Sequence, residues 1–136
     1  MMEIYRYTDD WDDIHKAWTL AMGSYYQKEV FPPDGYIVIR DSKPLMMAWV
    51  YVAFGIGIYW MAWITPNPDN SAIQNAVAMK FLLKRVDEIM QRDKYNCCFI
   101  MSNNEPLSKM LKTEGFVKNH EGVQYWKTWE TKQVAV

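Results

Sequence analysis

The stretch ITPNPDNSAIQNAVAMKFLLKRV, residues Ile64 to Val86, indicates the fold more strongly than any other part of the chain. It begins as the end of a strand, turns at prolines and asparagines, and continues as a helix with apolar residues at helical spacing. A turn of this kind often binds phosphate, because free backbone amides gather at the start of the helix. Such turns normally contain glycine, and this one has none. The stretch therefore predicts a strand, turn and helix with the position of a phosphate site but without its glycines.

The segment before this turn predicts a β-hairpin. Leu45 to Ile64 contains no charged residue, and its length would also suit a single membrane-spanning helix. Aromatic residues run through the whole segment, however, and Gly55 and Gly57 interrupt its middle. The pattern favours two buried strands, Leu45 to Phe54 and Ile56 to Thr65, joined at a glycine turn. Insertion of residues 45–64 into a membrane is the less favoured alternative.

The rest of the chain alternates between strand and helix patterns. Its order predicts an α/β (α+β) domain with a mixed, splayed central sheet of about six strands and helices on both faces. Ser71, Asn70 or Asp69 is expected to cap the long helix. The other elements are a strand at Met2 to Tyr7, a helix within Thr8 to Gly23, a strand at Gly35 to Asp41, the helix from Ser71 to Arg92, a strand at Asn96 to Asn103, a short helix within Asn104 to Gly115 and a last strand at Gly122 to Glu130.

One core is predicted from the apolar faces of these elements. It joins residues from the first helix, the hairpin, the long helix and the segments that follow it: Trp18, Val50, Val52, Leu82, Val86, Phe99 and Phe116. His15 is predicted to lie beside the buried face of the first helix.

Length and composition limit the classes of protein. The 136 residues suit a single domain spanning residues 1–136, with a short flexible tail over 131–136. The formal net charge of −1 predicts no general attraction to nucleic acid or to an anionic membrane. Cys97 and Cys98 are adjacent, and the N-terminus carries no secretory pattern, so we expect an intracellular protein with packed, reduced thiols. No residues have the spacing of metal ligands.

The sequence SNNEPLSKMLKTEGFV, residues 102–117, resembles a signature of the GNAT superfamily, the acetyl-CoA-dependent N-acetyltransferases. Asn104 takes the position of the family's Asn after its fifth strand, and Gly115 and Phe116 take that of its Gly-Phe pair. The order of elements is similar to the family's over nearly the whole chain, which implies a GNAT-like fold with acetyl-CoA as the cofactor if the protein is an enzyme. When the family's acetyl-CoA loop is aligned by counting back from the apolar residues of the long helix, the resemblance implies a set of cofactor-binding residues. They are Ile64, Gln74, Asn75, Ala76, Val77, Ala78, Met79 and Asn104.

Two parts of the family's chemistry are missing from these residues. Val77 and Met79, or Ala72 and Gln74 in the other register, stand where the family has glycines that let backbone amides approach a pyrophosphate. Leu111 takes the position at which the family often has a Tyr that protonates the leaving thiolate. No catalytic residue is assigned, and no cofactor is firmly expected.

Two functions follow from the resemblance and stay open at this point. Residues 80–117 also resemble a small GNAT-like internal virion protein of short-tailed bacteriophages, which implies a virion-associated or interaction protein with an eroded acetyl-CoA loop. The alternative is a divergent N-acetyltransferase acting on an amine of a small molecule or protein. A protein partner or self-association is expected rather than nucleic acid, membrane or metal, and the expected location is the host cytoplasm or the virion.

Overall fold

The computed structural model describes residues 1–23, 27–53, 55–101 and 105–117. Their order of elements agrees with the predicted one to within a few residues at each boundary. They comprise β1 (Met2–Arg6), the short 3₁₀ helix η1 (Asp9–Trp11), α1 (Asp12–Ala21), a second 3₁₀ helix η2 (Lys28–Val30), β2 (Asp34–Arg40), β3 (Lys43–Ala53), β4 (Ile58–Pro66), α2 (Ala72–Arg92), β5 (Cys97–Ile100) and α3 (Glu105–Thr113).

The strands form one mixed sheet in the order β1-β2-β3-β4-β5. The first four are antiparallel neighbours, whereas β5 runs parallel to β4 after the crossover through α2. Five strands are described where about six were predicted, and the predicted last strand, 122–130, lies outside the described residues. Predicted positions 102–104 and the tail 131–136 also lie outside them.

The hairpin prediction for residues 45–64 is confirmed. β3 and β4 pair through most of their length and turn at Gly55 and Gly57, both of which have a positive φ that favours glycine. No helix in the described part of the chain is long and apolar enough to cross a membrane.

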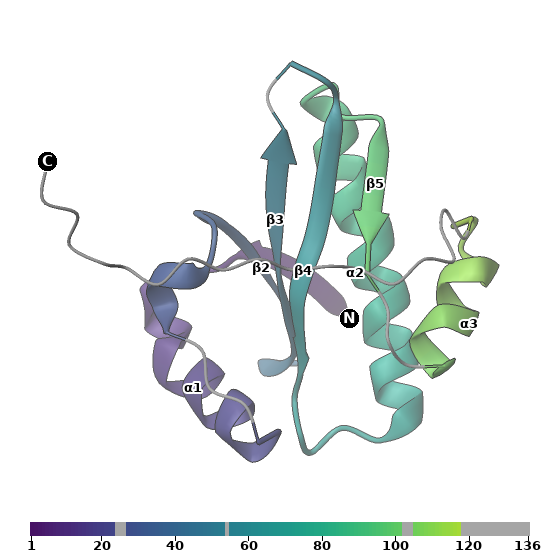
Figure 1. Cartoon of the computed structure of the whole chain (residues 1–136). Coiled ribbons are helices and arrows are strands. Elements are labelled where there is room, and N and C mark those ends of the chain that lie inside the picture. Colours follow the sequence, from purple (N-terminus) through teal and green to yellow (C-terminus); the bar gives the residue numbers. More distant parts are fainter. Residues whose placement is uncertain (24–26, 54, 102–104, 118–136) are drawn as a thin grey trace, which may run out of the picture.

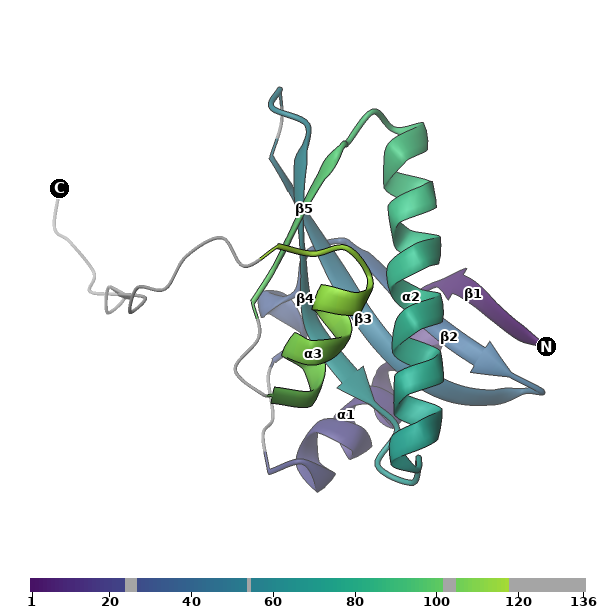
Figure 2. The ribbon, with the colours of Figure 1, turned by 90° about the vertical axis from the view of Figure 1, so that its right-hand side faces the viewer.

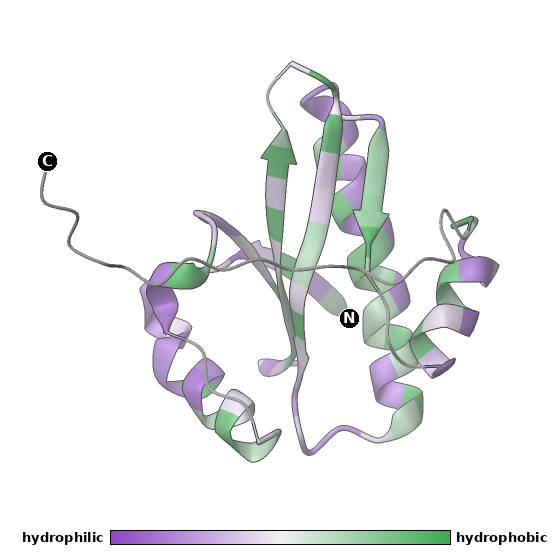
Figure 3. Cartoon of the chain, in the orientation of Figure 1, coloured by the Kyte–Doolittle hydropathy of each residue, from purple (hydrophilic) through white to green (hydrophobic). Residues whose placement is uncertain are grey.

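Helices cover both faces of the sheet, as predicted. α1 lies on one face, and α2 and α3 lie on the other (Figures 1 and 2). In Figure 3 the strands are mostly green or pale, whereas green and purple alternate along the turns of the helices. This is the pattern expected of a buried sheet covered by amphipathic helices.

The sheet separates two cores rather than enclosing one. Successive residues of a strand point to opposite faces, so in β2 Val38 faces α2 while Ile37 faces α1. The α1-side core consists of Trp18, Ile37, Met47 and Trp49. The larger α2-side core consists of Tyr36, Val38, Leu45, Met46, Ala48, Val50, Tyr59, Met61, Ala78, Met79, Leu82, Leu83, Val86, Met90 and Leu111.

The predicted single core is therefore wrong for Trp18 and Phe99. Trp18 belongs to the α1-side core. Phe99 is half-buried and stacks on Trp60 at 5.9 Å between ring centroids, while its neighbours Cys98 and Ile100 face the α2-side core. Periodicity correctly found the apolar side chains, but it does not state which face of the sheet each one reaches. The other five residues lie in the α2-side core or pack against it.

β4 diverges from its neighbour and contains a bulge. Within the described residues it pairs with β5 from Ile58 to Met61, and the rest of β4 runs on past the described end of β5 (Figure 1). Where Met47 pairs with Thr65 but Trp49 pairs with Ala62, one residue of β3 faces two of β4. Trp63 lies in this bulge with a φ of 55°, a left-handed conformation that is unusual for a bulky residue.

We expect Gly35→Ala to destabilise the protein by about 1 to 3 kcal/mol through overpacking. Gly35 pairs with Trp49 across β2 and β3, and an added Cβ would lie 2.5 Å from the Trp49 indole nitrogen. The indole cannot move freely because Tyr7, His15 and Phe31 surround it. Urea unfolding followed by tryptophan fluorescence measures the effect. A loss below about 0.3 kcal/mol would mean that Trp49 moves aside without cost.

Candidate functional site

The turn between β4 and α2 is closed by a capping box. The Ser71 hydroxyl accepts a hydrogen bond from the Gln74 amide at 3.1 Å, and the Gln74 side-chain oxygen accepts one from the Ser71 amide at 2.8 Å. This arrangement satisfies amides at the helix start with the chain's own side chains. Of the three candidate caps, Ser71 is therefore the one used.

Asparagines hold the rest of the turn against the start of β3. The Asn67 side chain donates to the Pro44 carbonyl and accepts from the Asp69 amide, both at 2.9 Å. The Asn70 side chain donates to the Leu45 carbonyl at 2.8 Å and to the Asn75 side chain at 2.9 Å. These side chains serve to fix the turn.

The turn between β4 and α2 offers a pyrophosphate fewer binding groups than the glycine loop of the GNAT family does. Within the described residues, the first-turn amides of Ala72 and Ile73 have no hydrogen-bond acceptor, whereas Gln74 and Asn75 donate to Ser71. No residue from 65 to 72 has a positive φ, so the backbone does not curl into an anion-binding nest. The side-chain oxygen of Asn70 is buried without a partner and adds negative potential to the turn. Two amides and an unpaired oxygen are a poor cradle for a highly charged group.

The predicted cofactor-binding residues on α2 lie just beyond these free amides. Gln74 and Asn75 are occupied by the contacts above, and Ala76 is half-buried. Val77 is 39% exposed. Ala78 and Met79 instead point into the α2-side core, so their side chains cannot contact a ligand outside it. The assignment of this stretch to cofactor binding remains a prediction.

Two of the predicted residues around α3, Leu111 and Gly115, can be compared with the structure. Leu111 is buried in the α2-side core, so the position at which the family often has a proton donor is used for packing. α3 ends as predicted at Gly115, whose φ is 91°. Asn104 lies outside the described residues.

The cysteines show no sign of a nucleophile. The prediction of packed thiols is wrong for Cys97, which is exposed, whereas Cys98 is half-buried beside Tyr59. Burial is the main cause that raises the pKa of the Cys98 thiol to about 11, so it stays protonated at neutral pH. The part of the chain that the structure describes contains no group of His, Cys, Asp and Glu that could hold a metal ion.

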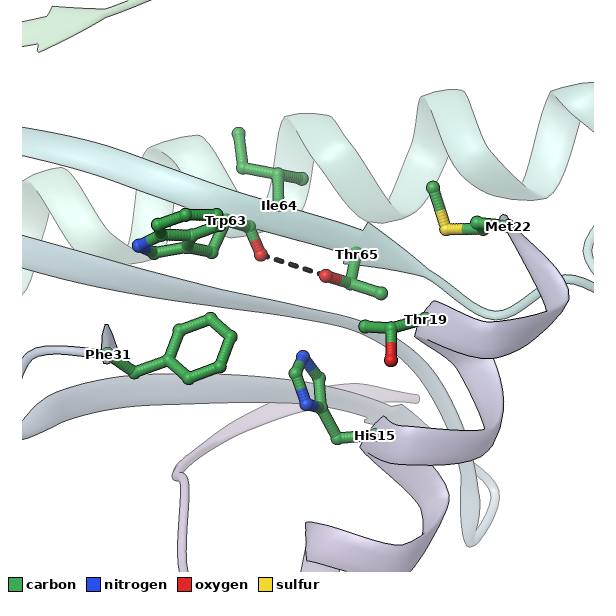
Figure 4. Close-up of a pocket in the computed structure, with 7 residues that line it drawn as sticks. All are labelled: His15, Thr19, Met22, Phe31, Trp63, Ile64 and Thr65. Atoms are coloured by element: carbon green, nitrogen blue, oxygen red, sulfur yellow. Dashed lines mark hydrogen bonds between the residues drawn. The ribbon is translucent and has the colours of Figure 1, made fainter. Parts of the chain in front are cut away.

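A pocket of about 200 Å³ lies on the opposite side of β4, against α1. Its walls come from α1, the segment after η2 and the β4 bulge, and we call it the α1–β4 pocket (Figure 4). The lining residues are His15, Thr19, Met22, Phe31, Trp63, Ile64 and Thr65. Of the predicted cofactor-binding residues, Ile64 is the one that lies in this pocket.

The bulge is fixed by hydrogen bonds on both sides of Trp63. The Trp63 indole donates to the Tyr51 hydroxyl at 2.7 Å, and that hydroxyl donates to the Val30 carbonyl at 3.1 Å. The Thr65 hydroxyl donates to the Trp63 carbonyl at 2.9 Å. These contacts connect β3, β4 and the last residue of η2, and they hold Trp63 in its left-handed conformation.

His15 lines the α1–β4 pocket, although the sequence pattern predicted only that it lies beside the buried face of the first helix. It is 7% exposed and lies among Tyr7, Phe31 and Trp49, with ring centroids 4.8 to 6.2 Å away. Its Nε2 atom is buried and has no hydrogen-bond partner. Burial lowers the pKa of His15, and nearby Asp12 opposes this only in part, so the ring is neutral at pH 7. Its place on α1 signalled burial, but the pocket exists only because α1 packs on β4.

This histidine predicts a loss of stability in mild acid. Because the folded-state pKa of His15 is below its ordinary value of about 6.5, the unfolded chain binds more protons as pH falls through this range. Stability is therefore expected to fall between pH 7 and pH 5. Urea unfolding at both pH values should show a smaller fall for His15→Phe, which keeps an aromatic ring. Equal falls for the two proteins would contradict this prediction.

No protein-family model and no curated protein sequence match the chain. Solved structures are similar throughout its length. The aminoglycoside acetyltransferase meta-AAC0020 from an uncultured soil metagenomic sample has a TM-score of 0.72 at 10% identity, covering 95% of this chain and 97% of that chain. The ribosomal-protein-S18-alanine N-acetyltransferase from Escherichia coli has a TM-score of 0.69 at 11% identity, covering 88% and 80% respectively. A probable acetyltransferase has a TM-score of 0.72 at 13% identity, covering 96% and 99%.

The chain therefore has the fold of the GNAT acetyltransferases, as the resemblance in its sequence implied. At these identities the likeness shows the fold, and the function has to come from the site.

Proposed function

We propose that this GNAT-fold chain acts through protein contacts rather than through acetyl transfer. The observation that carries the proposal is the turn between β4 and α2, which has no glycine, where Ser71 and Gln74 satisfy each other's amides and only the amides of Ala72 and Ile73 are left for a pyrophosphate. Leu111, packed in the α2-side core, supplies no proton for a leaving thiolate. A protein that kept the fold but not these groups retains a rigid scaffold for binding.

The resemblance of residues 80–117 to an internal virion protein supports a specific setting. That stretch covers most of α2 and all of β5, and it ends just beyond α3. Lys80 on α2 forms an ion pair at 3.5 Å with Glu114, the residue that follows α3. The proposed protein is phage-encoded, made in the host cytoplasm and carried in the virion. Its partner is another virion protein or a second copy of this chain.

Mass spectrometry of purified particles tests this setting. Particles of a phage that encodes the chain are purified on a density gradient and treated with protease before they are opened. We expect peptides of this chain to remain in the treated particles together with those of other internal proteins. Loss of these peptides with the external contaminants would overturn the virion assignment.

One observation favours a second candidate, a divergent N-acetyltransferase. Among the described residues, β4 pairs with β5 from Ile58 to Met61, and beyond them it bulges against β3 at Trp63, whose backbone departs from regular strand geometry. Backbone donors placed there could polarise a thioester carbonyl. Release of free CoA from acetyl-CoA, followed with a thiol reagent, tests this candidate. Sisomicin and an alanine-containing peptide of ribosomal protein S18 are suitable acceptors, after the names of two similar structures.

A further inference from the structure

β1 is an edge strand without the features that usually prevent pairing with another chain. Among the described residues, β2 is the one strand that pairs with it, and Figure 2 shows β1 and the N-terminus at the margin of the molecule. Natural edge strands are usually protected by proline, by lysine or by a bulge. β1 contains no proline or lysine, and its pairing with β2 is regular over all five residues. Its outer edge can therefore accept a further strand.

The backbone groups on this edge come from alternate residues of β1. The Tyr7 amide, just beyond the end of β1, donates to the Gly35 carbonyl at 2.8 Å, so these two residues form a hydrogen-bonded pair. Such pairs alternate along an antiparallel ladder, and the backbone groups of the residues between them point away from β2. The residues whose amides and carbonyls lie along the free edge are therefore Met2, Ile4 and Arg6.

A second copy of β1 fits this edge in one antiparallel register. When the two strands are centred on Ile4, the outward groups of Met2 meet those of Arg6, and each Ile4 meets the other. This register uses all five residues of both strands and places Glu3 opposite Tyr5. Moving the centre to Glu3 would place two carboxylates directly opposite each other, which is destabilising. The edge is therefore self-complementary about Ile4.

The charge of the chain and the space beside the edge also suit a second copy. The formal net charge of −1 produces little repulsion between two copies. Glu3 and Tyr5 border an open groove of about 740 Å³ that Trp11 and Ile39 also line, which leaves room for the Tyr5 ring of the second copy. On the other face of β1, Ile4 packs against the α2-side core. Pairing at Ile4 therefore brings the apolar surfaces of the two copies together.

We propose that the chain forms a two-fold symmetric dimer in which β1 pairs antiparallel with β1 of a second copy, centred on Ile4. The sheets of the two copies then form one continuous sheet, and the free backbone groups of β1 become hydrogen-bonded. This inference deepens the proposed function, on which it rests for the choice of a protein partner, by naming the partner and the surface. A strand pair of this length buries a small area, so we expect a weak dimer with a dissociation constant of about 100 µM or less.

Sedimentation equilibrium of the full chain tests the dimer. At pH 7 the chain is measured at concentrations from about 5 µM to about 500 µM, which span the expected dissociation constant. We expect the mass to rise with concentration toward twice that of one chain. The mass of a single chain at every concentration would overturn the dimer, whereas the virion assignment would still stand or fall by the particle experiment.

Two opposite charges at Tyr5 test the register. Tyr5 is 48% exposed, so both substitutions are on the surface of the monomer. Tyr5→Glu places a carboxylate opposite Glu3 of the second copy, and Tyr5→Lys places an ammonium group there. Because the contact occurs twice in a symmetric dimer, we expect the Lys variant to dimerise at least about tenfold more tightly than the Glu variant. Equal dissociation constants would overturn the proposal.

Leu20→Glu and Leu20→Lys are the matched controls for net charge. Leu20 lies on α1 and is 56% exposed, and its two variants should differ by less than about threefold. A difference as large as that at Tyr5 would mean that overall charge controls association, and would overturn the proposal.

Ile4→Pro tests the hydrogen bonds at the centre of the pair. It removes an amide that points away from β2, so the ladder between β1 and β2 keeps its bonds. We expect dimerisation to weaken at least about tenfold. An unchanged dissociation constant in the folded variant would place the dimer contact elsewhere and overturn the proposal. If Ile4→Pro does not fold, the two Tyr5 variants decide.

Discussion

Calorimetric titration of the chain with acetyl-CoA is expected to show no binding tighter than about 1 mM, a free energy no more favourable than about −4 kcal/mol. The pyrophosphate would meet only the amides of Ala72 and Ile73, while Ser71 already occupies those of Gln74 and Asn75. Opening the capping box to release more amides would cost about 1 kcal/mol or more, which further weakens binding. A micromolar dissociation constant would return the chain to the N-acetyltransferases.

A variant with glycines at the helix start provides the comparison. Asn70→Gly together with Ala72→Gly allows positive φ at both positions and removes the unpaired Asn70 oxygen. We expect this variant to bind acetyl-CoA more tightly than the unaltered chain if crowding and repulsion at the turn cause the weak binding. Equal affinities would mean that another part of the fold prevents it. Circular dichroism verifies that both proteins are folded.

Leu82→Ala is expected to destabilise the protein by about 2 to 5 kcal/mol. Leu82 is fully buried in the α2-side core, between α2 and the sheet, and removing its side chain leaves a cavity that this packed core cannot fill. Urea unfolding at pH 7 measures the loss. A change below about 0.5 kcal/mol would mean that α2 does not pack on the sheet through this face.

The loss of stability in Phe99→Ala is compared with that in Leu82→Ala, because Phe99 lies outside the α2-side core. Phe99 is half-buried, and its ring stacks on Trp60, which is itself 38% exposed. Less apolar surface leaves water there on folding, so we expect a loss at least about 1 kcal/mol smaller than that of Leu82→Ala. Equal losses would place Phe99 in a closed core, as its sequence pattern alone had predicted.

Local patterns predicted the elements and their ends well. Ser71 caps α2, Gly115 ends α3 and the two glycines turn the hairpin, because capping and positive φ depend on a few neighbouring residues. The missing glycines between β4 and α2 were equally visible in the sequence. What they imply for the backbone became clear only when Asn67 and Asn70 were seen to fix the turn to β3.

The sequence by itself determined the order of strands and helices, the hairpin in place of a membrane span and the absence of glycine from the turn. Each of these depends on periodicity or on a single backbone position. Only the tertiary structure decided that the sheet separates two cores, that β4 bulges at Trp63 and that His15 lines a pocket. Those features arise where α1, β3 and β4 meet, and the packing of residues far apart in the chain is not written in the pattern of any one segment.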